Sequence, residues 1–508
     1  MSMLLSMDCI YEILGFLCND MHSLLCCCLV SKSWFKMSSA ILYRNPCKFF
    51  KILPLGTVDQ KRALQLLRVW YACIYPELQP SEELESLLNV SSLGPLTTNY
   101  LSLVNSIDLS SFNQLVQLLL SGDSVHSVGI RIHTMSELRV LWKIYQRRYA
   151  SSNLRQLVWD GCFPLEGFID NSTIYTVLED VSLDWLNGDN TLCPEHLDGI
   201  YQVTPRLSSL HIRVRFSKGD FTQVLGRLLK GLSPNTLRSL VLEGVPVNIT
   251  TLLESLLCNH RHSLKRLELN GYSFHSISLS ILTKFSILRC ISLAFCRGVD
   301  DSKLQQITQC SQLIDMDISK TDVTLTGLTD FIKSTGSRLR RLILNHLSMN
   351  IPNGLEVISD YCPKLTKLEL RRTVYNCRLG PRLISRCPQL ESLSLGDEVG
   401  NPPPFINTMV TSIIRSGNRL KFLDLGYCHL TITVLPLIML KTGLSIVGPI
   451  RCVGVELDSF PYKEKNQTST RMKGVTSDVY YDITKGLELP VAIFPPTFFM
   501  KPPKTQLE

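Results

Sequence analysis

The segment Cys258-Asn259-His260-Arg261-His262 contains three potential metal ligands. A zinc site takes four ligands, usually in pairs whose spacing lets them converge on one ion. Here the two histidines are two positions apart, and no second cysteine pair follows at zinc-site spacing. The run Cys26-Cys27-Cys28 lies in an expected helix, where adjacent side chains point in different directions and cannot form one chelate. We therefore expect no metal.

Signatures of catalysis are missing from the sequence. It contains no phosphate-binding Gly-x-x-x-x-Gly-Lys-Ser/Thr loop, no Gly-x-Gly-x-x-Gly and no His-Glu-x-x-His. It also contains no Gly-x-Ser-x-Gly nucleophile elbow. We expect a protein that is not an enzyme and uses no cofactor.

Composition narrows the class of protein. Of the 508 residues, 45% are hydrophobic and 19% are charged, which excludes a charge-rich disordered chain. The net charge of +8 is too small for this length to indicate nucleic acid. The N-terminal stretch lacks the basic start of a signal peptide, and no run has the length of a membrane span. We expect an intracellular protein, cytoplasmic or nuclear, with reduced thiols and no membrane partner.

The elements are predicted from a repeat, Leu-x-x-Leu-x-Leu, which occurs eleven times at a mean spacing of about 27 residues. Its copies begin at Leu154, Leu178, Leu207, Leu237, Leu264, Leu288, Leu313, Leu339, Leu365, Leu390 and Leu420. Weaker copies begin at Val104 and Val125. The alternating apolar residues predict a half-buried strand in each copy, and helix-period stretches such as Leu328, Phe331 and Ile332 lie between copies. One strand and one helix cannot form a core alone, so stacked copies predict an α/β solenoid with a parallel sheet on its concave side.

Cysteines recur at fixed places in the repeats. Residues 288–313 place Cys296 three positions after Leu293 and Cys310 three positions before Leu313. Cys362-Pro363 and Cys387-Pro388 repeat the second of these junctions, and Cys428 repeats the position of Cys296. This pattern resembles the cysteine-containing leucine-rich repeat. We expect these thiols to be small buried hydrophobic groups at the corners of the solenoid.

The first fifty residues have a different pattern. Ile10, Ile13, Leu14 and Leu17 follow helical spacing. After a turn at Asn19-Asp20, Ser23 could cap a second helix, and a third short helix would hold Ile41 and Leu42. Three short helices make a marginal domain that a partner can complete.

This segment resembles the F-box. The matching residues include Leu5, Asp8, Ile13-Leu14, Leu17, the stretch Leu29-Val30-Ser31-Lys32-Ser33-Trp34, Leu42, Tyr43 and Arg44, although Ser6 replaces the usual proline. The resemblance implies docking on the Skp-family adaptor of a cullin–RING ubiquitin ligase. Carried over to this chain, the adaptor-docking residues are Leu5, Ile13, Leu14, Leu17, Leu24 and Leu25. The alternative is that some of them form only the internal core of the three helices, as we expect for Trp34.

These patterns divide the chain into four parts. They are an F-box at 1–46, a helical linker or solenoid cap at 47–98, a solenoid at 99–450 and a Pro-rich tail at 451–508. A solenoid needs covers for its apolar ends, which the linker could supply. Within the tail, residues 461–479 are polar, and the segment after them is Pro-rich, apolar and aromatic. We expect this segment to pack back onto the solenoid, across the concave sheet, or to serve as a linear peptide for another protein.

The concave surface can be inferred from the repeat because strand side chains alternate. Candidate substrate-binding residues on it are His211, Arg213, Arg266, Glu268, Asp315, Asp317, Arg341, Asn345, Lys367 and Arg371. The last of these form a basic end, with Arg338, Arg340 and Arg372 nearby, that could bind an acidic or phosphorylated protein segment. The alternative is a solvated surface of mixed charge. The face has almost no aromatic residues, so nucleic acid is not expected.

The F-box resemblance, followed by leucine-rich repeats, implies the substrate-recognition subunit of an SCF-type ubiquitin ligase. In that role the chain marks a protein substrate for proteasomal degradation without being catalytic itself. The alternative is a leucine-rich scaffold that binds a partner without ubiquitin transfer.

Overall fold

The chain forms two compact units, residues 1–265 and 266–508. The computed structural model describes residues 7–17, 20–44, 68–69, 72–73, 100–104, 106–108, 154–159, 177–185, 192–197, 200–215, 217–347, 350–351, 354–372, 374–375, 379–395, 406–415, 419–424, 429–431, 445–447, 449–453 and 479–482. Leu5, Ser6 and Cys428 lie outside these ranges, as do most of the predicted linker and tail. The fold is α/β: short N-terminal helices are followed by a leucine-rich solenoid with a parallel sheet.

Three helices form the N-terminal part, as predicted: α1 (Met7–Phe16), α2 (Met21–Cys28) and α3 (Lys32–Arg44). The cap of α2 differs from the prediction. Asp20 is the N-cap, and its carboxylate accepts a hydrogen bond from the Ser23 backbone N–H at 3.1 Å. Ser23 lies inside the helix and donates its hydroxyl to the same carboxylate at 2.6 Å. A carboxylate at the start of a helix accepts hydrogen bonds from otherwise unpaired N–H groups and interacts favourably with the helix dipole. Helix α2 therefore begins before Ser23.

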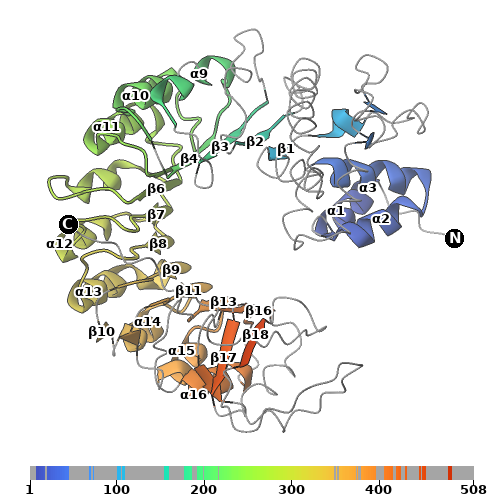
Figure 1. Cartoon of the computed structure of the whole chain (residues 1–508). Helices are drawn as coiled ribbons and strands as arrows, with labels where there is room; N and C mark the ends of the chain where they lie inside the picture. The colour runs from blue at the N-terminus through green and yellow to red at the C-terminus, as the bar shows by residue number, and fades with distance from the viewer. Residues whose placement is uncertain are drawn as a thin grey trace, which may run out of the picture. The chain divides into compact units, whose positions relative to one another are not determined.

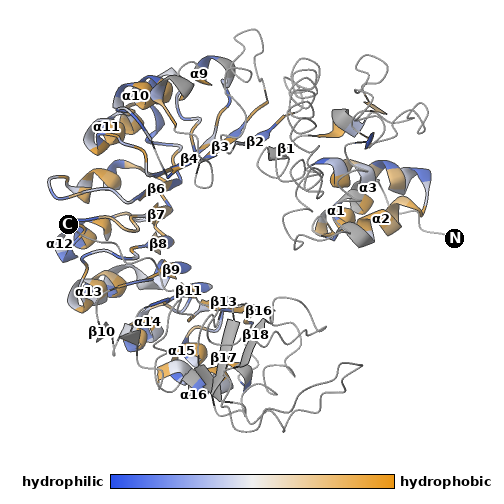
Figure 2. Ribbon diagram, viewed as in Figure 1, coloured by the Kyte–Doolittle hydropathy of each residue, from blue (hydrophilic) through white to orange (hydrophobic). Residues whose placement is uncertain are grey.

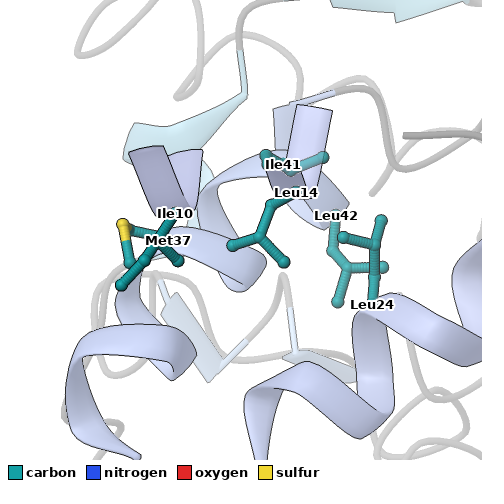
Figure 3. Packing of buried hydrophobic residues seen from close by; sticks show 6 residues of the cluster. All are labelled: Ile10, Leu14, Leu24, Met37, Ile41 and Leu42. Carbon is teal, nitrogen blue, oxygen red and sulfur yellow. The ribbon is translucent and has the colours of Figure 1, made fainter. Parts of the chain in front are cut away.

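The three helices share a small apolar core. Figure 3 shows its six buried side chains pointing toward one another: Ile10, Leu14, Leu24, Met37, Ile41 and Leu42. Trp34 and Leu17 pack against this core and are partly buried. The core side of α1 therefore includes Leu14 rather than its neighbour Ile13.

The rest of the first unit is built on parallel strands. Strands β1 (Ser106–Asp108), β2 (Gln156–Trp159), β3 (Asp180–Trp185), β4 (Ser209–Val214) and β5 (Ser239–Glu243) pair in chain order. Short helical segments η3 (Tyr100–Leu103), η6 (Pro194–Leu197) and α9 (Ile200–Val203) and the longer helices α10 (Thr222–Gly231) and α11 (Ile249–His260) accompany them. The rings of Tyr43 in α3 and Tyr100 in η3 have centroids 4.4 Å apart and planes tilted by 35° to each other.

The second unit continues the same plan. Its strands β6 (Arg266–Asn270), β7 (Cys290–Ser292), β8 (Asp315–Asp317), β9 (Arg341–Ile343), β11 (Lys367–Glu369), β13 (Ser392–Ser394), β14 (Phe422–Asp424) and β16 (Ser445–Val447) pair in parallel. Between them lie η7 (Leu279–Lys284), α12 (Asp301–Ile307), α13 (Leu325–Thr335), η8 (Gly336–Arg338), α14 (Gly354–Tyr361), α15 (Gly380–Arg386) and α16 (Ile406–Arg415). In this unit the strands line the inner side and the helices the outer side (Figure 1). Helices need about 8–10 Å of spacing and strands about 4.8 Å, so the sheet becomes the concave side.

Each of the eleven predicted repeat copies contains a strand, and the weaker copy at Val104 contains β1. In β4 the side chains alternate between half-buried and buried along the whole strand. The template leucines form the core; Leu210, Leu240, Leu342 and Leu368, for example, are fully buried. Figure 2 shows apolar and polar stretches on different sides of the helices, as one-sided packing requires. The copy at Val125 lies outside the described residues.

The predicted cysteine positions are confirmed where the structure describes them. Cys296, Cys310, Cys362 and Cys387 are buried. The Cys296 thiol donates to the Leu269 carbonyl at 2.9 Å, and the Cys387 thiol donates to the Cys362 carbonyl at 3.3 Å. Burial raises the pKa of Cys362 and Cys387 to about 12 and that of Cys296 to about 11. These thiols are protonated structural groups at neutral pH.

Two small sheets lie in the C-terminal half. Strand β10 (Asn350–Ile351) pairs with β12 (Val374–Tyr375), and β15 (His429–Thr431) pairs with β17 (Pro449–Val453). The one strand described within 461–508, β18 (Val479–Asp482), pairs antiparallel with β17. This part of the tail therefore belongs to a three-stranded sheet in the order β15, β17, β18. Within the described residues, no helix has the length and apolar character to cross a membrane.

Candidate protein-binding surfaces

Exposed apolar side chains gather on the N-terminal helices. Ile13 and Phe16 lie one turn apart on α1 and are 43% and 86% exposed. Leu25 in α2 and Leu29 just after it are also one turn apart, with 48% and 88% exposed, and Val30 follows with 62%. The other large hydrophobic residues exposed in the described parts are Phe295 and Tyr361. Several exposed large apolar side chains within so short a segment are typical of a surface that another protein covers.

The structure sorts the six predicted adaptor-docking residues. Ile13 and Leu25 are exposed and can meet a partner, whereas Leu17 is half-buried against the core. Leu14 and Leu24 are fully buried and belong to the core of the three helices. Leu5 lies outside the described residues.

Phe16, Leu29 and Val30 were not among the predicted docking residues. Each is apolar and lies outside the stripe that spacing assigns to the core. The sequence could have indicated these residues, because a short helix with apolar residues on two sides can bury only one side in its own domain. We use the name apolar helix face for the set of exposed apolar side chains Ile13 and Phe16 on α1, Leu25 on α2, and Leu29 and Val30 just after α2.

The first unit carries two of the predicted substrate-binding residues. His211 and Arg213 alternate on β4, with their side chains on the sheet face. The Nε2 atom of His211 lies 3.1 Å from both the Ser209 and Ser239 hydroxyls. The register places Arg213 between Asp184 and Glu243, and its Nε lies 3.7 Å from a Glu243 carboxylate oxygen. This face is polar, and the Arg213 guanidinium has a carboxylate residue on the strand to either side.

The second unit carries the other eight, and the register arranges them in rows across the strands. One row runs Arg266, Cys290, Asp315, Arg341 and Lys367, and the next runs Glu268, Ser292, Asp317, Ile343 and Glu369. Asn345 and Arg371 come two residues after these strands. The predicted residues of this unit therefore share one face of one sheet.

Carboxylates pair with three basic side chains of the predicted basic end. Arg341 lies 3.7 Å from Asp315, and Lys367 lies 2.6 Å from Glu369. The Arg371 guanidinium pairs with Asp424, a buried carboxylate on β14 that lies beyond the intervening strand β13. Arg338 points elsewhere, because it donates to the carbonyls of Thr308 and Cys310. These ion pairs give the sheet face a mixed charge, as in the second alternative.

The pKa values of the acidic groups on this face are shifted in different directions. Burial raises the pKa of Asp317 and of Asp315, against hydrogen bonds from Ser319 and the charge of Arg341, respectively. Burial would also raise the pKa of Glu369, but hydrogen bonds from Lys367 and Asn345 together hold it below its usual range. Asn345 donates to Glu369 at 2.9 Å and accepts from the Arg371 N–H at 2.8 Å, so it joins two repeats. The network positions side chains more than it stabilises the fold, because partly exposed ion pairs contribute only about 0–1 kcal/mol.

Within the Cys258–His262 cluster, His260 is a buried structural residue. His260 is buried, and its Nε2 lies 2.9 Å from the Leu229 carbonyl oxygen, whereas Cys258 and His262 are exposed. Among the described residues, no three His, Cys, Asp or Glu side chains come together in a group that could hold a metal ion.

No protein-family model matches the chain, and no curated protein matches its sequence. Solved structures are similar to it in chain path. The crystal structure of the Rad7 and Elc1 complex from yeast aligns with a TM-score of 0.45 and 17% identity, covering 66% of this chain and 86% of the other. The TLR13–ssRNA13 complex aligns with a TM-score of 0.32 and 17% identity, covering 65% and 41%. Neither similarity carries a functional conclusion.

Proposed function

We propose that this protein is a non-catalytic substrate-recognition subunit of a cullin–RING ubiquitin ligase. The observation that carries the proposal is the apolar helix face, which gathers most of the exposed large hydrophobic residues of the described chain within residues 13–30. The F-box resemblance of the same segment supplies the partner, a Skp-family adaptor and through it a cullin. An apolar face on short helices suits docking against a helical partner.

The solenoid is the substrate-binding part in this proposal. Its sheet presents rows of half-buried polar side chains held by neighbouring repeats, a rigid surface on which a protein can be recognised. Holding a substrate near the ubiquitin-charged enzyme raises the effective concentration of its lysines, which needs no catalytic group in this chain. The complex would act in the cytoplasm or nucleus and direct its substrate to the proteasome.

Capture of a purified Skp-family adaptor by the full chain tests the proposal. We expect Phe16→Asp and Leu29→Asp each to weaken adaptor binding at least tenfold, because each places a charge in an apolar contact. Lys36→Asp is the control, since Lys36 is exposed on α3 and lies outside the apolar helix face. Thermal unfolding should be unchanged in all three variants, because these side chains are not in the core.

Undiminished adaptor capture by both variants would refute the docking assignment. Normal adaptor capture by the wild type without any change in a bound protein's cellular lifetime would instead favour a leucine-rich scaffold. Proximity labelling with and without proteasome inhibition, comparing the intact chain with one lacking residues 1–46, separates ligase components from substrates.

A further inference from the structure

One residue in each of several successive repeats has a left-handed backbone. These residues are Gly244, Gly271, Phe295, Lys320, His346 and Arg372, with φ values of 71°, 84°, 61°, 52°, 57° and 51°. Each lies two positions after the last apolar residue of its repeat template, as Phe295 follows Leu293 and Lys320 follows Ile318. The chain makes the same turn at the end of each of these strands.

Glycine is the residue expected at such a position, because side chains disfavour positive φ. Gly244 and Gly271 follow this rule, whereas the next four repeats carry a phenylalanine, a lysine, a histidine and an arginine. A side chain would also fit at Gly271, since an added Cβ there would meet nothing within 4 Å. Lack of space therefore does not explain why this repeat has glycine and the next four do not. The side chains are therefore kept at a cost in backbone energy, a feature common at functional sites.

Packing of these side chains in the core does not offset the backbone strain. Lys320 and Arg372 are exposed, Phe295 is 50% exposed, and His346 is half-buried. Deleting these side chains would leave the buried leucines of the repeats in place.

Backbone hydrogen bonds hold the four residues in line. The N–H groups of Phe295, Lys320 and His346 donate to the carbonyls of Ser319, Asn345 and Arg371, at 2.8, 2.9 and 2.8 Å. Each acceptor directly precedes the left-handed residue of the next repeat. The Lys320 ammonium lies 5.5 Å from the centroid of the Phe295 ring, and the rings of Phe295 and His346 have centroids 6.2 Å apart. We call Phe295, Lys320, His346 and Arg372 the edge strip.

We propose that the edge strip binds an extended acidic polypeptide segment that also carries an apolar side chain. Lys320 and Arg372 would attract its carboxylates, and the half-exposed Phe295 ring would contact its apolar group. The cation–π contact with Phe295 leaves the positive charge of Lys320 in place.

A single-stranded nucleic acid fits the strip less well. Binding of successive bases relies on several aromatic faces. The strip has one phenylalanine, and the Lys320 ammonium already lies near its ring. This proposal rests on the proposed function, because the edge strip would be the place where the solenoid holds an acidic segment of its substrate. The experiment that tests the edge strip does not involve the adaptor.

The test measures binding of a fluorescein-labelled ten-residue peptide of alternating Glu and Leu to the full chain by fluorescence anisotropy. We expect Lys320→Gly with Arg372→Gly to weaken binding at least tenfold. The unfolding temperature of this variant should be unchanged or higher, because glycine accepts the left-handed backbone without strain. A control, Lys284→Gln with Lys333→Gln, removes the same charge from exposed helical positions and should leave binding unchanged.

Equal binding of a Gln-and-Leu peptide would overturn the proposal, as would equal weakening by the control variant. A lower unfolding temperature for the double glycine variant would show that the side chains are structural. Tighter binding of labelled oligouridylate, lost in the same variant, would assign the strip to nucleic acid. Adaptor capture tests the proposed function independently of peptide binding, so failure of the edge-strip proposal and failure of the proposed function can be distinguished.

Discussion

At the scale of single residues, chemical type was a poor guide to role until burial was known. Cys258, His260 and His262 are potential ligands by type, yet the two exposed side chains flank a histidine whose ring is buried against the Leu229 carbonyl. Burial lowers the pKa of His260, and the carbonyl contact only partly opposes this. The residue is a neutral packing group that links α11 to α10.

His260 makes stability depend on pH. The unfolded chain binds a proton at a pKa of about 6.5 and the folded chain at a lower value, so protons favour unfolding. The stability contributed by neutral His260 is complete above the unfolded pKa and is lost as the pH falls below it. We expect the unfolding temperature to fall between pH 7.5 and pH 5.5, by a larger amount in the wild type than in His260→Gln. An equal fall in both proteins would show that other groups cause it.

At the scale of elements, the repeats are joined by caps as well as by apolar packing. The Asp301 carboxylate, at the start of α12, accepts hydrogen bonds from the Thr324 N–H at 2.6 Å and from the Thr324 hydroxyl. Thr324 is the N-cap of α13. One side chain thus positions the next helix, and Gly327 leaves the space that it occupies.

Gly327→Ala tests this link. An added Cβ would lie 2.1 Å from a carboxylate oxygen of Asp301 and 2.6 Å from its Cβ, so Asp301 must move away from Thr324. Alanine improves helix propensity by about 1 kcal/mol, but overpacking and loss of the cap cost more, about 1–3 kcal/mol. We expect a net loss of stability in urea unfolding.

Gly226→Ala in α10 is the matched control. The nearest atom to its added Cβ is the Ser255 hydroxyl oxygen at 3.9 Å. Propensity should therefore dominate and stabilise the protein by about 0.5–1 kcal/mol. If both variants behave alike, the Asp301 contact is not a structural constraint.

At the scale of the whole molecule, a solenoid has no single centre. Each strand pairs with its neighbours in the sheet, and each buried leucine packs in a layer with those of adjacent repeats. Stability in such an array is close to a sum of repeat terms and neighbour terms. Damage to one repeat should therefore remain local.

Leu342→Ala measures this locality. Leu342 is fully buried on β9, in register with Met316 and Leu368. The cavity should cost about 2–5 kcal/mol. Hydrogen exchange should increase in β8, β9 and β11 and stay unchanged in α1–α3, with Lys333→Ala as the surface control. Uniform loss of protection along the chain would show global cooperativity instead.

Much of the fold was predictable because its rules are local and repeated. Alternating side chains in Leu-x-x-Leu-x-Leu specify which residues face the core of each strand, and eleven copies confirm one another. The α/β solenoid, its parallel sheet and the burial of Cys296 and Cys362 follow from this pattern. The repeat template does not predict strand β16, because Ser445–Val447 lacks the leucine spacing.

The sites depend on contacts between distant parts of the chain, which no local rule contains. Ile13 and Leu14 are adjacent apolar residues on one helix, and the packing of the N-terminal helices selects Leu14 for the core and leaves Ile13 exposed. Arg371 counts as a basic residue in its own repeat, but the fold places it against Asp424 from two strands further along the sheet. The core pattern could be inferred residue by residue because burial follows local spacing, whereas the exposed and charged surfaces depend on which segments the fold brings together.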